Sequence, residues 1–344
     1  MLSQPHAGGR NSPDIIGTSG AGLPSVRLDH LVTGKVKFGV RIHQGGYSYE
    51  ELRRIWTQAD RLGFYSATLY DLLNVPTLEC WTALSALASE TRQIRLTPLV
   101  LANPYRHPAL LAKMASTLDV ISGGRLELGI GAGGGGADHL ASGFPYPSAA
   151  VRVEMLEEAA QVIKALWTEP KASFQGNHYS LEGAVNEPKP LQKPHPPILI
   201  GGRGETYLFR AVARFADICN AGFEMSLEEH ESKFNILAEH CRRYERELSE
   251  IEVTHNTRVV IAENSVEFVR QVAGGAADAN ISVADHGESL KRAIAGTPEA
   301  CVEQIQTYVD HGIRYFFLLF PDPISSESLD LFAREVMPHF DGGG

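Results

Sequence analysis

The sequence has little cysteine and no cysteine spacing that would bind a metal. Its 344 residues include four cysteines, Cys80, Cys219, Cys241 and Cys301, which lie far apart and form no C-x-x-C pair. This spacing predicts neither a metal site nor a disulfide framework. Scattered cysteines are typical of a reducing compartment, so we expect a cytoplasmic protein without a bound metal.

Long apolar runs and excess positive charge are also lacking. No run of about 18 apolar residues occurs, so no transmembrane helix is predicted. A net charge of −10 argues against broad binding to nucleic acid or to an anionic membrane. The first 22 residues lack the basic-then-apolar pattern of a signal peptide and are rich in Gly, Ser and Pro. We therefore expect residues 1–35 to form a flexible arm.

From residue 36 onwards, short apolar β-prone segments alternate with segments of helical periodicity. The first strand is expected within KVKFGVRI, and the helix after it begins at a capping box of Ser48 and Glu51. Seven further strands, each followed by at least one helix, are expected at 65–70, 94–101, 125–131, 197–202, 216–222, 254–263 and 314–320. Eight such units in one series predict an α/β fold, a (β/α)8 TIM barrel in a single domain over 36–340, rather than a doubly wound open sheet.

The alternation is interrupted after the fourth βα unit. Residues 172–183 have the pattern of a small β-hairpin that turns at Gly176-Asn177, and NEPKPLQKPHPP at 186–197 is a proline-rich extended segment. We expect both to form an insertion in the barrel. Because a TIM barrel has its site at the carboxyl ends of its strands, the residues there are the functional candidates.

The fourth strand runs into five glycines in LGIGAGGGGADH at 128–139. Gly129, Gly131 and Gly134 match G-x-G-x-x-G, but the next clear helix is expected only near Ala149, so a dinucleotide site is weakly supported. A purely structural loop is one alternative. The other is a nest of backbone N–H groups that binds an anion.

A second glycine segment follows the fifth strand, in ILIGGRGETYLFRAVARFAD at 198–217. Gly201, Gly202 and Arg203 stand directly before the expected helix at 205–215, where N–H groups and the helix dipole attract phosphate. A tight βα turn is the alternative. Two neighbouring glycine-rich strand ends suit a phosphate-bearing cofactor lying across the mouth of the barrel.

Several stretches resemble the bacterial luciferase-like monooxygenase superfamily. They are YDLLNVPTLECWTALSALASETRQIRL, RHPALLAKMASTLDVISGGRLELGIGAG, PPILIGGRGE and GTPEACVEQIQTYVDHGIRYFFLLFPD, and they are most similar to its coenzyme F420-dependent branch. The resemblance implies a (β/α)8 barrel with a deazaflavin or flavin ring in its mouth. It implies a cofactor tail held by Ala132, Gly133, Gly134, Gly135, Gly201, Gly202 and Arg203. It also implies a non-prolyl cis peptide at Leu99-Val100 beside the ring, with Asn103 on the loop that faces the ring.

Two positions depart from the pattern of that branch. The second strand commonly ends Asp-His there, whereas this chain has Asp71-Leu72. Many relatives have a tryptophan where this chain has Gly134, so we expect a wider pocket or a more mobile loop.

The function implied by the resemblance is hydride transfer between C5 of coenzyme F420 and a small organic substrate. Asp71 is the expected polar contact at the ring or substrate, although it could instead cap the following turn. His43 is an acid–base candidate, and it or His139, the expected substrate contact, could replace the missing histidine. Glu79, Arg106 and His107 are further candidates at the mouth.

Two rival functions stay open at this point. One is a monooxygenase that uses reduced FMN and O₂ and needs a partner reductase. The other is a cofactor-binding protein without turnover. The weak dinucleotide match would predict NAD(P) binding instead. The resemblance also implies a homodimer.

Overall fold

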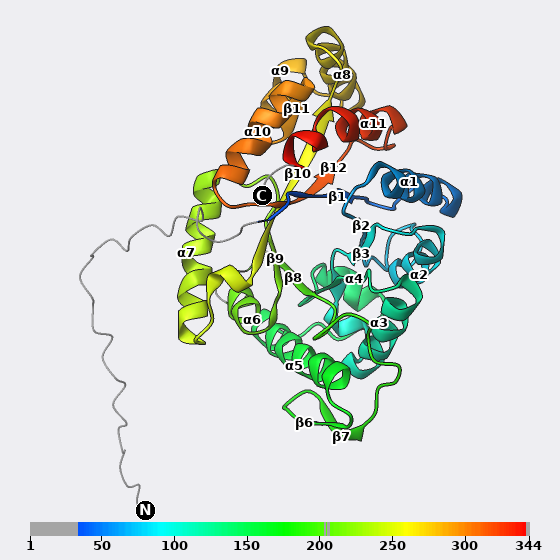
Figure 1. Ribbon diagram of the computed structural model, residues 1–344, viewed down its shortest axis with the longest axis vertical. Coiled ribbons are helices and arrows are strands. Elements are labelled where there is room, and N and C mark those ends of the chain that lie inside the picture. The colour runs from blue at the N-terminus through cyan, green and yellow to red at the C-terminus, as the bar shows by residue number, and fades with distance from the viewer. Residues whose placement is uncertain (1–33, 203, 205–206, 342–344) are drawn as a thin grey trace, which may run out of the picture.

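The computed structural model describes residues 34–202, 204 and 207–341. The strands form a ring of parallel pairs in the order β3-β2-β1-β12-β10-β9-β8-β5-β4 (Figure 1). Their bounds are β1 Lys37–Arg41, β2 Ser66–Leu69, β3 Arg95–Pro98, β4 Leu101–Ala102, β5 Leu128–Gly131, β8 Ile198–Gly202, β9 Ile218–Ala221, β10 Glu252–Ile261 and β12 Tyr315–Leu319.

The ring closes between the third and fourth predicted strands. Leu96 in β3 bridges Leu126 in parallel: the Leu96 amide donates to Arg125 O at 2.9 Å and the Glu127 amide to Leu96 O at 3.0 Å. Strands β3 and β4 are two pieces of the predicted third strand, separated by a non-prolyl cis peptide at Leu99-Val100. The predicted TIM barrel and the predicted position of this cis peptide are therefore confirmed.

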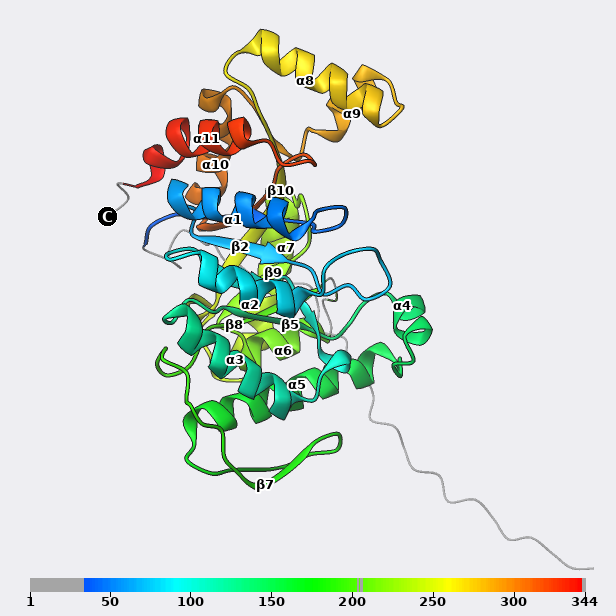
Figure 2. The same cartoon turned by 90° about the vertical axis from the view of Figure 1, so that its right-hand side faces the viewer.

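Helices surround the ring and cover its outer face (Figures 1 and 2). The helices of the described chain are α1 Tyr49–Leu62, α2 Cys80–Glu90, α3 Pro108–Ser122, α4 Gly136–Ala141, α5 Ala149–Thr168, α6 Leu208–Phe215, α7 Leu227–Arg243, α8 Ser265–Asp278, α9 Val283–Ser289, α10 Pro298–Asp310 and α11 Ser326–Glu335, with 3₁₀ turns at Asn103–Tyr105, Leu248–Glu250 and Met337–Phe340. Within the described ranges, no helix is both long enough and apolar enough to cross a membrane.

The insertion lies where the sequence predicts it, after α5. Strands β6 (Ala172–Gln175) and β7 (Ser180–Ala184) form an antiparallel hairpin, and the carboxylate of Glu158 accepts three amide hydrogen bonds at its turn, from Asn177, His178 and Tyr179. The proline-rich segment then leads to β8.

Several elements differ from the sequence prediction. Strand β10 begins at Glu252 instead of residue 254, and a short strand β11 (Ile294–Gly296) pairs with it. Helix α7 ends at Arg243, not at residue 248, because the chain turns at Glu245 with a φ of 54°. The glycine run contains the short helix α4, which the expected start at Ala149 had missed. The predicted arm at 1–35 lies outside the described residues except for Gly34 and Lys35, and the single-domain assignment over 36–340 stays a prediction.

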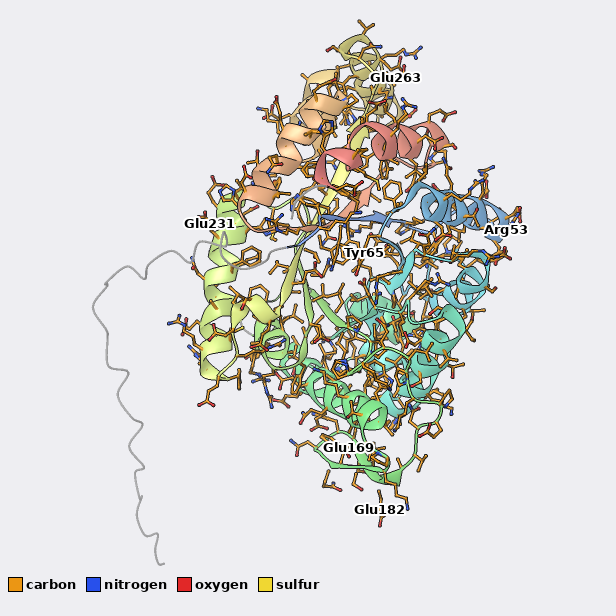
Figure 3. All side chains as sticks on the ribbon, viewed as in Figure 1. Arg53, Tyr65, Glu169, Glu182, Glu231 and Glu263 are labelled. Atoms are coloured by element: carbon orange, nitrogen blue, oxygen red, sulfur yellow. The ribbon has the colours of Figure 1, made fainter. Side chains whose placement is uncertain are left out.

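Charged and aromatic side chains fill the amino-terminal end of the barrel. The buried Glu127 accepts hydrogen bonds from Arg95 Nε at 3.0 Å, Thr97 Oγ1 at 2.8 Å and the Tyr315 hydroxyl at 2.8 Å. Lys37 donates to Glu252 at 2.8 Å beside them. Figure 3 places Tyr65, which packs edge-on against Tyr315, near the centre of the molecule. The opposite end, where the strands finish, is therefore the end at which a pocket can open.

Candidate functional site

A pocket of about 560 Å³ opens at the carboxyl ends of the strands. This volume falls in the range of small-molecule and cofactor sites. Its lining brings together both glycine segments, the cis peptide and the end of β2: Tyr70 to Leu73, Leu99 to Ala102, Tyr105, Gly131 to Gly135, Asp138, Ala149, Arg152, Val153, Gly201, Gly202, Gly204, Tyr207 and Leu208. In Figure 2, α4, which carries Asp138, lies on the side of the molecule toward which β2 points.

The glycines of the two segments have two different roles: some allow close packing, and others border the pocket. A Cβ on Gly129 would lie 1.9 Å from Pro98 O, and one on Gly131 would lie 2.9 Å from Gly201 O. The Val100 side chain would be 2.8 Å from a Cβ at either Gly131 or Gly201. These glycines therefore make room for the interruption of the third strand, which is a packing reason independent of any ligand.

The next three glycines face the pocket. Gly133 and Gly135 have φ of 84° and 66°, a left-handed conformation that favours glycine. A Cβ on Gly134 would meet nothing within 4 Å, so this residue borders open space. Successive amides in such a turn form a concave surface suited to an anion.

His139 lies beneath this loop and is fully buried. Its Nδ1 lies 3.3 Å from both the Tyr105 hydroxyl and Gly135 O, and its ring packs on Tyr105 with centroids 4.4 Å apart. Its Nε2 would lie 3.0 Å from a Cβ on Gly133. His139 is not among the residues that line the pocket. Its predicted contact with substrate stays a prediction. The described contacts instead make it a support for the glycine loop.

Asp71 lines the pocket as predicted, but its carboxylate is already engaged. Arg106 donates to both of its oxygens, at 2.7 and 2.9 Å, and the Ala102 amide donates to Oδ2 at 2.9 Å. Arg106 also donates to Glu79 at 2.7 Å, and Glu79 caps α2 through the amides of Trp81 and Thr82. Arg106 therefore forms ion pairs with two carboxylates, those of Asp71 and Glu79.

Burial acts to lower the pKa of the Arg106 guanidinium, but the hydrogen bonds and charges of Asp71 and Glu79 outweigh it and raise that pKa. The cation is therefore permanent. An Asp71 carboxylate held by a bidentate guanidinium and a backbone amide is suited to fixing the strand ends in place.

The other predicted residues lie near the pocket or outside the described chain. His43 is exposed at the end of β1, with its ring centroid 5.2 Å from that of Tyr70. Asn103 is buried and donates to the Tyr179 hydroxyl of the insertion at 3.2 Å. Neither lines the pocket, and their predicted roles stay predictions. Arg203 lies outside the described residues.

Several pocket residues were missed by sequence reasoning, among them Tyr70 and Arg152. Tyr70 accepts a hydrogen bond from Arg41 Nε through its hydroxyl oxygen, and burial raises its pKa. Arg152 lies in the first turn of α5, stacked on Tyr146 with its Cζ 3.8 Å from the ring centroid. A cation just after a predicted helix start, downstream of a glycine run, was a signal that could have identified Arg152.

The chain is similar to known oxidoreductases over most of its length. It is 26% identical over 337 residues to an F420-dependent glucose-6-phosphate dehydrogenase of Microbacterium testaceum, covering 89% of this chain and 98% of the relative. It is also 34% identical over 124 residues to the FMNH2-dependent dimethylsulfone monooxygenase of Pseudomonas putida, covering 36% of this chain and 34% of that protein.

Among solved structures, the coenzyme F420 dependent tetrahydromethanopterin reductase of Methanopyrus kandleri superimposes with a TM-score of 0.73 at 20% identity, over 89% of this chain and all of that one. The model of the luciferase-like monooxygenase family matches residues 32–315. The chain therefore belongs to the luciferase-like monooxygenase family, whose relatives found here are oxidoreductases.

Proposed function

We propose that the protein is an F420-dependent oxidoreductase that transfers a hydride to or from a small organic substrate. The observation that carries the proposal is the pocket itself, which gathers the Gly133–Gly135 loop, the end of β8 and the interrupted third strand at one end of the barrel. The similarity to an F420-dependent dehydrogenase along nearly the whole chain favours the deazaflavin as cofactor.

The residues present fit such a cofactor. Leu99, Val100 and Leu101 supply an apolar wall against which a flat ring could lie, and the open side of Gly134 leaves room for a phosphate tail. When bound, the deazaflavin would supply a carbon that accepts or donates hydride. The chain would bind and orient it and exclude water from the reacting atoms.

We assign Asp71 a positioning role at this site. Its ion pair with Arg106 ties the end of β2 to the loop after β4 and leaves no carboxylate oxygen without a hydrogen bond. The further groups in the pocket that can exchange a proton are Asp138 and the hydroxyls of Tyr70, Tyr105 and Tyr207. The apolar Leu72 stands at the position where the F420-dependent branch commonly has a histidine.

A reduced-FMN monooxygenase is the second candidate, favoured by the similarity of about a third of the chain to an FMNH2-dependent enzyme. It would require O₂ and a partner reductase. Cofactor binding without turnover is a third candidate function, because the carboxylate of Asp71, the expected catalytic residue, is paired with Arg106. A homodimer and a cytoplasmic location belong to the proposal as well; the four cysteines are buried free thiols, which agrees with a reducing compartment.

Fluorescence titration tests the cofactor. We expect the purified protein to quench F420 fluorescence at micromolar concentration and to bind FMN and NAD(P) at least tenfold more weakly. Binding of FMN with none of F420 would overturn the proposal in favour of the monooxygenase. A panel of alcohols, activated alkenes and imines, followed at the F420 absorbance, then separates turnover from binding alone.

A further inference from the structure

Arg152 is a cation in the pocket without a carboxylate partner among the described residues. Its Nη1 donates to Pro147 O at 2.5 Å, and this is its only hydrogen bond within that part of the chain. Its Nε is buried and has no hydrogen-bond partner there. A guanidinium carries five N–H donors and stays charged in proteins, so most of its hydrogen-bonding capacity is unused.

The other charges of the pocket do not neutralise it. Asp71 is paired with Arg106, which already holds a second carboxylate in Glu79. The Asp138 carboxylate accepts from the Asn74 side-chain amide at 3.5 Å and forms no ion pair among the residues described. Arg152 thus lines the same pocket as the glycine loop with its charge available to a ligand.

The stacking of Arg152 on Tyr146 holds the guanidinium in a fixed orientation. Tyr146 in turn packs beside His139, with ring centroids 4.9 Å apart, and its ring would lie 2.6 Å from a Cβ on Gly136. The cation and the glycine loop are therefore parts of one packed unit. A fixed planar guanidinium beside a set of backbone amides matches the oxygens of a phosphate group.

We propose that Arg152 is an anion-binding residue of this pocket and makes the affinity of the pocket for the cofactor depend on the phosphate of the cofactor tail. The inference rests on the proposed function in that the pocket takes a phosphate-bearing chromophore, but not on whether this is F420 or FMN. The glycine amides supply shape, whereas Arg152 supplies the charge that distinguishes a phosphorylated tail from an uncharged one.

The test compares phosphorylated and phosphate-free forms of each chromophore by fluorescence titration. The pairs are F420 with its phosphate-free deazariboflavin chromophore, and FMN with riboflavin. We expect the wild type to prefer the phosphorylated member. In Arg152→Gln, which removes the charge but leaves a polar side chain with N–H donors, the preference should fall by about tenfold to a hundredfold, the usual range for a charged hydrogen bond. Arg152→Lys should restore most of it.

Arg54→Gln is the matched control, since it removes the same charge from an exposed position on α1 and should leave the preference unchanged. If Arg152→Gln weakens the binding of both members of a pair equally, or keeps the wild-type preference, Arg152 is a packing residue and the inference is wrong. If the wild type binds the FMN pair but not the F420 pair, the proposed function fails while the FMN pair still decides on Arg152. Binding of none of the four compounds overturns both.

Discussion

At the scale of single residues, Gly134 differs from its neighbours in the glycine run. A side chain there meets no protein atom within 4 Å and requires no left-handed backbone, yet it borders the pocket. Gly133, by contrast, has a φ of 84° and would place a Cβ 3.0 Å from His139 Nε2. The two positions therefore separate an effect on the ligand from an effect on the fold.

We expect Gly134→Val to weaken cofactor binding at least tenfold without lowering Tm, because the side chain would occupy ligand space. Gly133→Ala should instead destabilise the protein by about 1 kcal/mol, since a residue with a Cβ is strained in the left-handed region. Fluorescence titration and thermal unfolding of both variants check this. Wild-type affinity in Gly134→Val would contradict the assignment of the loop to the cofactor.

The ion pair of Asp71 and Arg106 is the second feature at this scale. Both side chains are largely buried, with 1% and 12% of their surfaces exposed. Arg106→Met should lower the free energy of unfolding by about 3–5 kcal/mol, because it leaves a buried carboxylate without its cation. The double variant Asp71→Asn, Arg106→Met should recover much of this loss in urea denaturation. Equal stability of the single and double variants would mean that the carboxylate is solvated.

At the scale of elements, β10 and α7 meet through a buried histidine pair. His230 Nε2 and His255 Nδ1 are 2.9 Å apart, and the other ring nitrogen of each is buried without a partner among the described residues. Tyr308 stacks on His255, while Glu229 and Lys233 are the charged groups that act on His230. Burial lowers the pKa of His230 to about 3 and that of His255 well below its usual value. Both rings are therefore neutral in the folded protein at physiological pH.

This pair predicts a loss of stability in acid. In the unfolded chain the two imidazoles bind protons near pH 6.5, whereas in the folded protein they stay neutral at that pH. The free energy of unfolding therefore decreases as the pH falls below about 6.5. We expect His230→Phe to reduce the slope of unfolding free energy against pH by about 1.4 kcal/mol per unit between roughly pH 6 and 4. Urea denaturation across this range measures it. Identical slopes in the variant and the wild type would show that His230 titrates normally.

At the scale of the whole molecule, the barrel is filled at one end and open at the other. Lys37, Glu252, Arg95 and Glu127 occupy the amino-terminal end, and the pocket occupies the carboxyl-terminal end. The β6–β7 hairpin and the α8–α9 pair do not line that pocket. Ligand binding should therefore stabilise distinct parts of the chain to different extents.

We expect F420 at a hundredfold excess over its Kd to raise the free energy of unfolding by about 2.7 kcal/mol. Hydrogen exchange should slow most in residues 99–105 and 131–141, and not in the β6–β7 hairpin. Mass spectrometry with and without the cofactor checks this. Protection confined to the hairpin or to α8–α9 would place the binding site elsewhere.

The alternation of elements, the insertion and the glycine-rich strand ends could be predicted because each depends on local periodicity and composition. The cis peptide at Leu99-Val100 was predicted from the family resemblance and not from local periodicity. Strand ends of a parallel barrel meet at one face, so the pocket at Asp71, Val100 and Gly133 to Gly135 followed from the strand count. Short elements such as α4 and β11 were missed because an element of so few residues is too short to show a periodic pattern.

Only the tertiary structure decided what lies opposite each of these residues. Asp71 is engaged because Arg106, 35 positions away in the chain, reaches it; Gly129 is needed because Pro98 O lies where its side chain would be. His139 supports a loop and Arg152 faces the pocket for the same reason. Periodicity determines which elements form, whereas the role of a charge or of a missing side chain depends on long-range contacts that no local pattern encodes.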